Sequence, residues 1–377
     1  NSFTSDSEGS DSSFVTQPGK TYTMDVVLRD NIKMDRMGTY SGTVTSSVPS
    51  HFNPGGNTVD FFSGSDAMYS VVLSRGSKTF GVANRLSLYK NYLDGNGWHN
   101  SGETSWPADR NSEEFYNFSA CSGSEEIYAA VAADVSTRYG WQGFSYVYKY
   151  KNGAWETSTR DVVTSSLHTP TTSGRKLYSF GKAIKIVPST DKGYHFVASD
   201  TNHGSISYTI NKEGGKSEDT ATVSIGANRG VLFLFHSSSA KGLVQQNIFH
   251  NVGTADANSD NFRNTRLDMV SSSFTAPSSS FNGLFITAGT IAADSPSSNA
   301  GAVCLYYSSS IHGTSSAVVT DPEPAVNGYF GNRVAAGVNN SLPNHNFYFA
   351  AQTVRDPQGT VEFFTASVRD SSTEVQI

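Results

Sequence analysis

Short apolar runs recur along this chain, and each is followed, after a loop and usually a Gly, by a second run in which apolar and polar residues alternate. A continuous apolar run of about five residues is typical of a strand buried on both faces, whereas alternation is typical of a strand with one wet face. The chain lacks any extended stretch with the apolar spacing and caps of an amphipathic helix. The pattern therefore predicts an all-β protein built from repeated antiparallel sheets.

Seven copies of this pair of runs are visible, at an average spacing of about 54 residues, the size of a propeller blade with its loops. The first runs are Met24–Leu28, Met68–Val72, Ile127–Val131, Tyr194–Ala198, Val231–Phe235, Leu284–Ala288 and Phe347–Ala351. The second runs begin at Gly42, Arg85, Gly143, Gly204, Gly242, Gly301 and Gly359. The spacing is uneven, and the fourth and fifth copies lie so close together that four strands hardly fit between them.

We therefore predict a seven-bladed β-propeller of four-stranded antiparallel blades, with a β-sandwich or another blade number as the alternative. Gly-containing turns just before Trp98 and Trp155 predict tight hairpins, and we interpret these two Trp as covers of blade edges. Residues 1–13 are polar and Ser-rich, which predicts a disordered tail. Residues 14–377 are expected to form the propeller as a single domain.

Charge and cysteine content narrow the functional classes. The chain has 27 Lys and Arg against 33 Asp and Glu, a net charge of −6, and no basic stripe, so we expect no nucleic-acid partner. No apolar run is long enough to span a bilayer. A start at Asn1 suggests a processed secreted, cell-surface or virion-surface protein. Cys121 and Cys304 are interpreted as buried free thiols in strands, although the sequence leaves a disulfide open.

Two copies carry Phe-Gly just ahead of the apolar strand, at Phe180-Gly181 and Phe330-Gly331. These segments resemble the FG-GAP repeat of integrin-type seven-bladed propellers, with Phe118 and Phe281 as degenerate equivalents. The resemblance implies that both Phe-Gly pairs occupy the same position in two blades. It also implies Ca²⁺ in a loop of alternating oxygen ligands, and one segment has this spacing, at Asp256, Asn258, Asp260 and Asn264. A polar surface loop with chance spacing is the alternative.

Catalytic signals are weak. The sequence holds no nucleophile elbow, phosphate loop or metal-binding His pair. Sialidases resemble the chain in blade number range and composition, but their repeated Ser-x-Asp-x-Gly-x-x-Trp box does not match the Asp-to-Trp spacing here. Carboxylates such as Glu125, Glu126, Asp134 or Asp200 can converge on a propeller's central face, yet nothing singles them out. The sequence thus favours a protein that is not an enzyme.

Long loops rich in aromatic residues offer the best binding candidates. Residues 90–117 contain His99 and Trp106, and residues 134–143 contain Arg138, Tyr139 and Trp141. Exposed aromatic rings stack on sugars or anchor a protein interface.

Three functional hypotheses follow from the sequence. The first is a non-enzymatic extracellular or virion-surface binding protein, an adhesin, lectin-like or receptor-binding propeller that recognises a glycan or a protein. The second is a structural subunit of a larger assembly or filament, in contact with copies of itself or with other subunits. The third is a propeller carbohydrate-active enzyme.

Overall fold

The structure is a computed structural model in which every regular element of the described residues is a β-strand. It describes residues 57–64, 67–74, 83–91, 98–106, 113–123, 125–137, 140–163, 180–189, 191–200, 206–211, 220–225, 231–240, 242–250, 261–276, 279–292, 297, 300–309, 313–324, 326–338, 346–354, 359–368 and 375–376. The first predicted copy and the predicted polar tail lie outside these residues.

The described strands form five four-stranded antiparallel sheets and one hairpin. The first sheet contains β1 (Asn57–Ser63), β2 (Met68–Ser74), β3 (Asn84–Asn91) and β4 (Trp98–Trp106). The second contains β5 (Glu113–Ser122), β6 (Ile127–Thr137), β7 (Gly140–Lys151) and β8 (Ala154–Val163). The third contains β9 (Ile184–Ser189), β10 (Gly193–Asp200), β13 (Val231–Ser238) and β14 (Gly242–His250), and the hairpin of β11 (Ile206–Asn211) and β12 (Thr220–Ile225) lies between β10 and β13 in the sequence. The fourth contains β15 (Asn261–Ala276), β16 (Ser279–Ala292), β17 (Ala302–Ser309) and β18 (Gly313–Thr320). The fifth contains β19 (Val334–Val338), β20 (Asn346–Thr353), β21 (Thr360–Val368) and β22 (Val375–Gln376).

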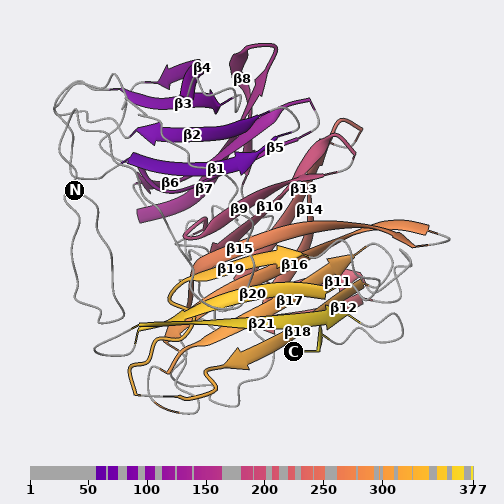
Figure 1. The fold of residues 1–377 in the computed structure, drawn as a ribbon. Helices are drawn as coiled ribbons and strands as arrows, with labels where there is room; N and C mark the ends of the chain where they lie inside the picture. Colours follow the sequence, from indigo (N-terminus) through magenta and orange to yellow (C-terminus); the bar gives the residue numbers. More distant parts are fainter. Residues whose placement is uncertain are drawn as a thin grey trace.

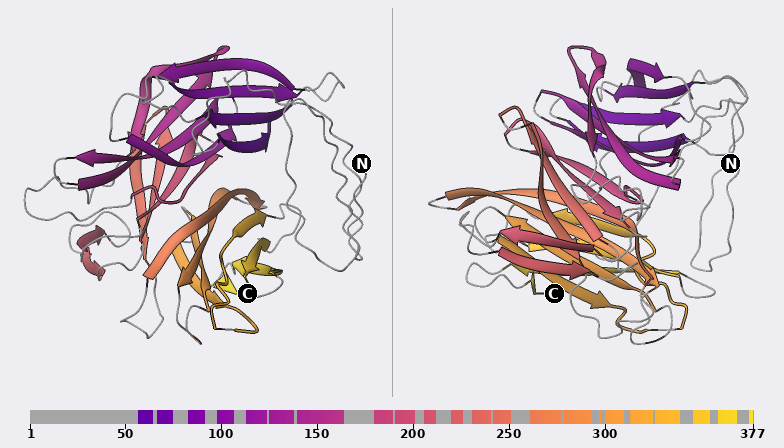
Figure 2. Two further views of the ribbon diagram at one scale, coloured as in Figure 1. Left: turned by 90° about the vertical axis from the view of Figure 1, so that its left-hand side faces the viewer. Right: turned by 180° about the vertical axis from the view of Figure 1, so that it is seen from behind.

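The sheets follow one another in an arc from the first to the fifth (Figure 1). The first strand of each sheet lies against the first strand of the next, in the order β1, β5, β9, β15, β19. Figure 2 shows the sheets from two further sides, with the first two at one end of the arc and the last two at the other. Four-stranded sheets that meet along their first strands are blades, so the chain is an all-β protein of β-propeller architecture.

The count of seven copies is not what the described residues show. The fourth and fifth predicted copies, Tyr194–Ala198 and Val231–Phe235, are β10 and β13, which pair with each other in one sheet. Both strands are buried on both faces, so their sequence patterns are alike. The close spacing of these two copies has its physical reason here, because they are the second and third strands of a single blade.

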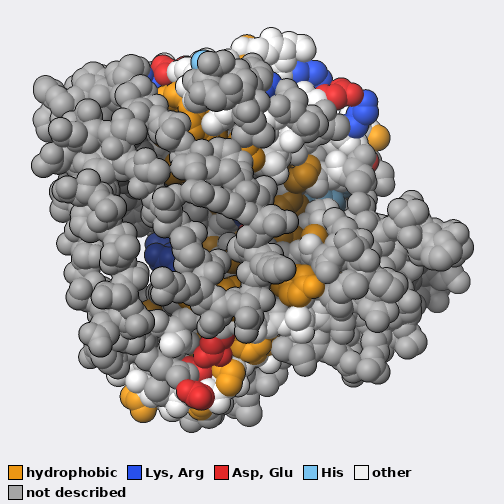
Figure 3. All heavy atoms as spheres, viewed as in Figure 1, with side chains coloured by type: hydrophobic (Ala, Val, Ile, Leu, Met, Phe, Trp, Pro, Cys, Tyr) orange, Lys and Arg blue, Asp and Glu red, His pale blue; other side chains and the backbone are white. Residues whose placement is uncertain are grey.

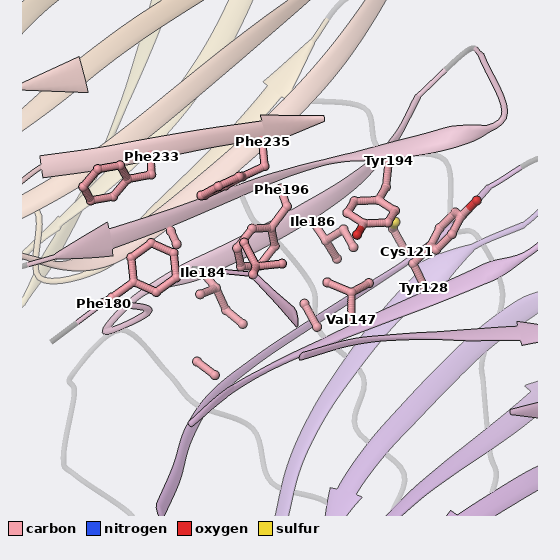
Figure 4. Packing of buried hydrophobic residues seen from close by; sticks show 14 of the residues in the cluster. Cys121, Tyr128, Val147, Phe180, Ile184, Ile186, Tyr194, Phe196, Phe233 and Phe235 are labelled. Carbon is pink, nitrogen blue, oxygen red and sulfur yellow. The ribbon is translucent and has the colours of Figure 1, made fainter. Parts of the chain in front are cut away.

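Each pair of neighbouring sheets shares a hydrophobic core. In the core between the second and third sheets, Tyr128 packs across against Tyr194 with ring centroids 5.0 Å apart, and Phe180 packs against Phe233 within the third sheet at 5.6 Å (Figure 4). Small residues permit the close approach, since Ala129, Ala130, Ala198, Ala288 and Ala351 are fully buried. The predicted pattern of short apolar strands buried between blades is confirmed.

The two Phe-Gly pairs occupy equivalent positions, as predicted. Gly181 donates its N–H to Ser199 O (2.7 Å), and Gly331 donates to Gln352 O (3.0 Å). Ser199 and Gln352 are the next-to-last residues of β10 and β20, the second strands of their sheets. Both Phe side chains are buried. The FG-GAP family assignment itself stays a prediction.

Phe118 and Phe281 are not equivalents of these residues. Phe118 lies within β5 opposite Val131, and Phe281 lies within β16 opposite Phe274, so neither occupies a turn ahead of a first strand. Their place in a strand pattern, rather than in a Phe-Gly turn, explains the missing glycine.

Several smaller predictions are confirmed. Asn152 and Gly153 have φ values of 52° and 84°, which fits the two-residue turn between Lys151 and Ala154. Trp155 is buried and packs edge-on against Tyr150 at 5.3 Å. Cys121 and Cys304 are buried free thiols in β5 and β17.

Within the described part of the chain, no helix has the length and apolar character needed to cross a bilayer. On the face shown in Figure 3, acidic and basic side chains lie side by side near the outer strands of the first two sheets. The ion pairs of the first sheet include Arg85–Glu103 (3.1 Å).

Candidate functional site

Charged side chains gather where the first strands meet. Asp60 on β1, Lys185 on β9 and Asp268 on β15 come from three different sheets, and together they form what we call the axial cluster. The Lys185 ammonium pairs with an Asp268 carboxylate oxygen at 3.1 Å, and the two side chains keep 28% and 18% of their exposure. The cluster is therefore sheltered but still reached by water.

Asp268 connects three blades. Its Oδ1 accepts a hydrogen bond from Met269 N–H (2.9 Å) in its own strand and faces Lys185 of the preceding sheet. Its Oδ2 accepts a hydrogen bond from Ala336 N–H (2.8 Å) on β19 of the following sheet. Each of these three groups donates to the carboxylate, so Asp268 is the acceptor in all three contacts.

Asp60, on β1 of the first sheet, makes hydrogen bonds of the same kind. Its Oδ1 accepts from Phe61 N–H (3.0 Å), and its Oδ2 accepts from Ala120 N–H (2.9 Å) on β5. Ser119 Oγ donates to the same oxygen at 3.4 Å and accepts from Ile186 N–H on β9 at 3.3 Å. These bonds link β1, β5 and β9 at the axis.

The two carboxylates of the axial cluster act on the charge of Lys185. Burial would lower the pKa of Lys185, but the carboxylates of Asp268 and Asp60 outweigh it and raise that pKa above its usual value. Lys185 is therefore a permanent cation between two carboxylates. Burial raises the pKa of the neighbouring Cys121 thiol, so this cysteine is not a nucleophile.

Two guanidinium groups lie close enough to interact, one on β15 and the other on the residue before β19. Arg266, two residues before Asp268 on β15, donates from Nε to Asn332 O at 3.2 Å. Arg333 donates from Nη1 to the same carbonyl at 3.1 Å. Burial, and then the charge of Arg333, lower the pKa of Arg266. The Asn332 carbonyl thus lies between two positive charges.

The binding residues predicted from sequence lie elsewhere. His99 and Trp106 are in β4, the fourth strand of the first sheet, and not in a loop. Trp141 is in β7, where its backbone pairs with Ser136, so the predicted loop 134–143 is largely strand. Arg138 and Tyr139 lie outside the described residues. The two groups belong to different sheets, the first and the second.

The predicted Ca²⁺ ligands are also divided. Asp256, Asn258 and Asp260 lie outside the described residues, while Asn264 lies in β15 at an irregular part of its pairing with β16. The Ca²⁺ site therefore stays a prediction. Among the described residues, no group of three or more His, Cys, Asp or Glu side chains can hold a metal ion.

The carboxylates named from sequence do not form the site. Glu125 and Glu126 follow the end of β5 and pair with Lys192 (2.7 Å) and Lys151 (2.6 Å). Asp200 ends β10, and Asp134 lies in β6. The sequence signal that was missed is an Asx residue followed by an apolar one in a first strand, as in Asp60-Phe61 and Asp268-Met269. In such a pair, the Asx side chain accepts a hydrogen bond from the N–H of the residue that follows it.

Fold and site together define a β-propeller with a charged axial cluster. No protein-family model and no curated protein matches the sequence. Solved structures that are similar include a Trypanosoma rangeli sialidase with the inhibitor DANA, at 10% identity and a TM-score of 0.34, over 81% of this chain and 54% of that one. The same sialidase with sialic acid matches at 11% identity and a TM-score of 0.30, over 92% and 59%. A mutant of it with trans-sialidase activity matches at 10% identity and a TM-score of 0.32, over 81% and 53%.

The chain spans less than two thirds of the length of these structures, and likeness at this level concerns the fold alone. By their names these are structures of one sialidase, which belongs to the class of the third hypothesis from sequence and not to that of the first. The interpretation as a non-enzymatic binding propeller is therefore corrected. The described parts of segments 90–117 and 134–143 are strands rather than loops.

Proposed function

We propose that this chain is a carbohydrate-active propeller that cleaves glycosidic bonds at the axial cluster. One observation carries the proposal: the carboxylates of Asp60 and Asp268 come from different blades and share the cation Lys185 at a place that water reaches. Expectations of secretion or surface display agree with such a substrate and stay predictions.

The chemistry needs two carboxyl groups. Glycoside hydrolysis uses one as the acid that protonates the leaving oxygen, and the other as the nucleophile or as the base for water. We assign the second role to Asp268, since its Lys185 and backbone partners all donate to it. Asp60 is then the other carboxyl group of the pair. This proposal replaces the expectation, made from sequence, that the chain has no catalytic activity.

A product assay tests the proposal. The chain is incubated with neutral glycosides, uronic polysaccharides and sialosides, and released sugars are detected by mass spectrometry. We expect turnover of one glycan class, with a loss of at least tenfold in Lys185→Met. Turnover that is unchanged in Lys185→Met would place the chemistry elsewhere, and the absence of any product would remove the proposal.

A further inference from the structure

A group of polar side chains fastens the turn between β9 and β10 to the end of β13. Asp191, in the turn, accepts a hydrogen bond at Oδ1 from Ser189 Oγ (2.7 Å). His236 Nε2, on β13, lies 3.0 Å from the same carboxylate oxygen and 3.2 Å from Ser189 Oγ. The turn also packs closely on β13, since a Cβ added at Gly193 would lie 1.7 Å from Ser237 O. We call Ser189, Asp191 and His236 the turn latch.

His195, on β10, stacks on the turn latch. Its ring lies nearly parallel to that of His236, with ring centroids 4.5 Å apart and an interplanar angle of 18°. His195 is buried, and its Nδ1 has no hydrogen-bond partner among the described residues. A proton added to this nitrogen would therefore be buried without an acceptor, next to a second imidazole. The docked turn thus favours a neutral His195.

The other charged groups on the elements around β10 are engaged elsewhere. Lys185 of β9 pairs with Asp268 of β15 at 3.1 Å, and Lys192 of the turn pairs with Glu125 of the second sheet at 2.7 Å. Asp200 lies at the far end of β10. In the fourth sheet, the strands β16, β17 and β18 contain no Asp, Glu, Lys, Arg or His. The turn latch itself therefore supplies the charges that act on His195.

We propose that the turn latch is a pH-dependent switch: the turn between β9 and β10 is docked on β13 while His195 is neutral, and it is released when His195 takes up a proton. Burial and the charge of His236 lower the pKa of His195 to about 4, against the smaller effects of Asp191 and of a hydrogen bond with Gln246. In the released turn the ring regains its ordinary pKa, so protonation favours release as the pH falls from 6.5 towards 4. The switch is independent of the proposed glycosidase activity.

Hydrogen exchange of the full chain, read by mass spectrometry at about pH 7.5 and about pH 5, tests the switch. Protection factors, the ratio of the intrinsic to the observed exchange rate, remove the direct effect of pH on exchange. For peptides that cover residues 187–196, we expect protection to be about 30-fold lower at pH 5, the change that a pKa of 6.5 in the released turn and about 4 in the docked turn predicts. Peptides from β6, in the second sheet, should keep their protection.

His195→Gln cannot take up the proton, so its protection over residues 187–196 should be equal at the two pH values. Peptides from β6 report whether this variant folds, and His195→Asn replaces it if their protection is lost. Three results would overturn the proposal. Equal protection of residues 187–196 at both pH values in the wild type would show that the turn is not released. The same loss in the His195 variant would place the titrating group elsewhere. An equal loss in β6 would show that the whole chain unfolds in acid.

Discussion

Asp60 and Asp268, which lie in the first and fourth sheets, make the same two hydrogen bonds. Each accepts from the N–H of the next residue through Oδ1, and each accepts from an amide of the next sheet's first strand through Oδ2. Asn117 in the second sheet does nearly the same, accepting from Phe118 N–H (2.8 Å) and donating from Nδ2 to Lys182 O (3.0 Å). A side chain that bends back on its own strand and reaches across thus fixes neighbouring blades at the axis.

Removal of such a side chain should weaken the contact between neighbouring blades. Asp268→Ala deprives Ala336 N–H of its acceptor and Lys185 of its partner, and we expect a loss of about 2–3 kcal/mol in the free energy of unfolding. Asp268→Asn keeps a side-chain acceptor and should lose less. Urea denaturation of the three proteins measures the difference. The exposed pair Glu125–Lys192 serves as a control, because Glu125→Ala should not change stability measurably. Equal effects of Asp268→Ala and Glu125→Ala would contradict the linking role.

Gly331 should tolerate no side chain. Its φ is 84°, and an added Cβ would lie 2.6 Å from Ala302 O and 3.1 Å from Gly289 Cα in the fourth sheet. Gly153 has the same φ but open space around it. We expect Gly153→Ala to cost about 1 kcal/mol from backbone strain alone, and Gly331→Ala to cost about 3 kcal/mol or more. Thermal unfolding of both variants provides the comparison, and equal losses would show that the blade contact at Gly331 is unimportant.

His195 should make stability depend on pH. Burial, and then the charge of His236 stacked on it at 4.5 Å, lower the pKa of His195 from 6.5 to about 4, although Asp191 and a hydrogen bond with Gln246 oppose the shift. Between pH 6.5 and pH 4 the unfolded chain binds a proton that the folded chain does not. The contribution of His195 to the free energy of unfolding is therefore at its maximum above pH 6.5. It falls by about 3 kcal/mol as the pH drops to 4.

The His195 contribution is isolated by subtraction. The free energy of unfolding of the wild type is measured at several pH values, and that of His195→Gln is subtracted at each. The difference should decline between pH 6.5 and pH 4. A difference that is constant across this range would mean that the pKa of His195 is the same in the folded and unfolded chain.

Both cysteines should be inert in the folded protein. Burial raises the pKa of Cys304 to about 12, and burial likewise raises that of Cys121, so neither forms a thiolate near neutral pH. A colourimetric thiol reagent should react with neither in the native state and with both in concentrated guanidinium chloride. Fast reaction in the native state would show that the blade interfaces open, and one or no reactive thiol in denaturant would show modification or a disulfide.

The sequence was informative where a strand is buried on both faces. Ile127–Val131 was predicted as such a strand and is part of β6, and the Phe-Gly turns were placed correctly in two blades. The same pattern is shared by second and third strands, so Tyr194–Ala198 and Val231–Phe235 looked like two blades once the β11–β12 hairpin separated them. A repeated turn was overlooked: Ser63-Gly64 and Ser122-Gly123 end β1 and β5, and the glycine N–H groups donate to Ala67 O (2.8 Å) and Glu126 O (2.7 Å).

The axial cluster could not be found from the sequence. Asp60, Lys185 and Asp268 are far apart in the chain and sit in first strands, which have the weakest apolar patterns. Their proximity depends on which sheets become neighbours, and this is decided by the cores between the blades. The sequence pointed instead to segments rich in aromatic residues, because such segments are recognised locally. Which residues of distant strands meet at the axis depends on the whole fold.

The most direct test of the proposed function compares two aspartate variants, with the glycan that the wild type cleaves best as the substrate. Asp268→Asn alters the axial cluster, while Asp161→Asn alters a similar partly buried aspartate on β8 that pairs with Lys149 at 3.5 Å. Both variants are first shown to be folded by circular dichroism. We predict that kcat/KM falls at least a hundredfold in Asp268→Asn and less than threefold in Asp161→Asn. Equal kcat/KM in folded Asp268→Asn and the wild type would contradict catalysis at the axis.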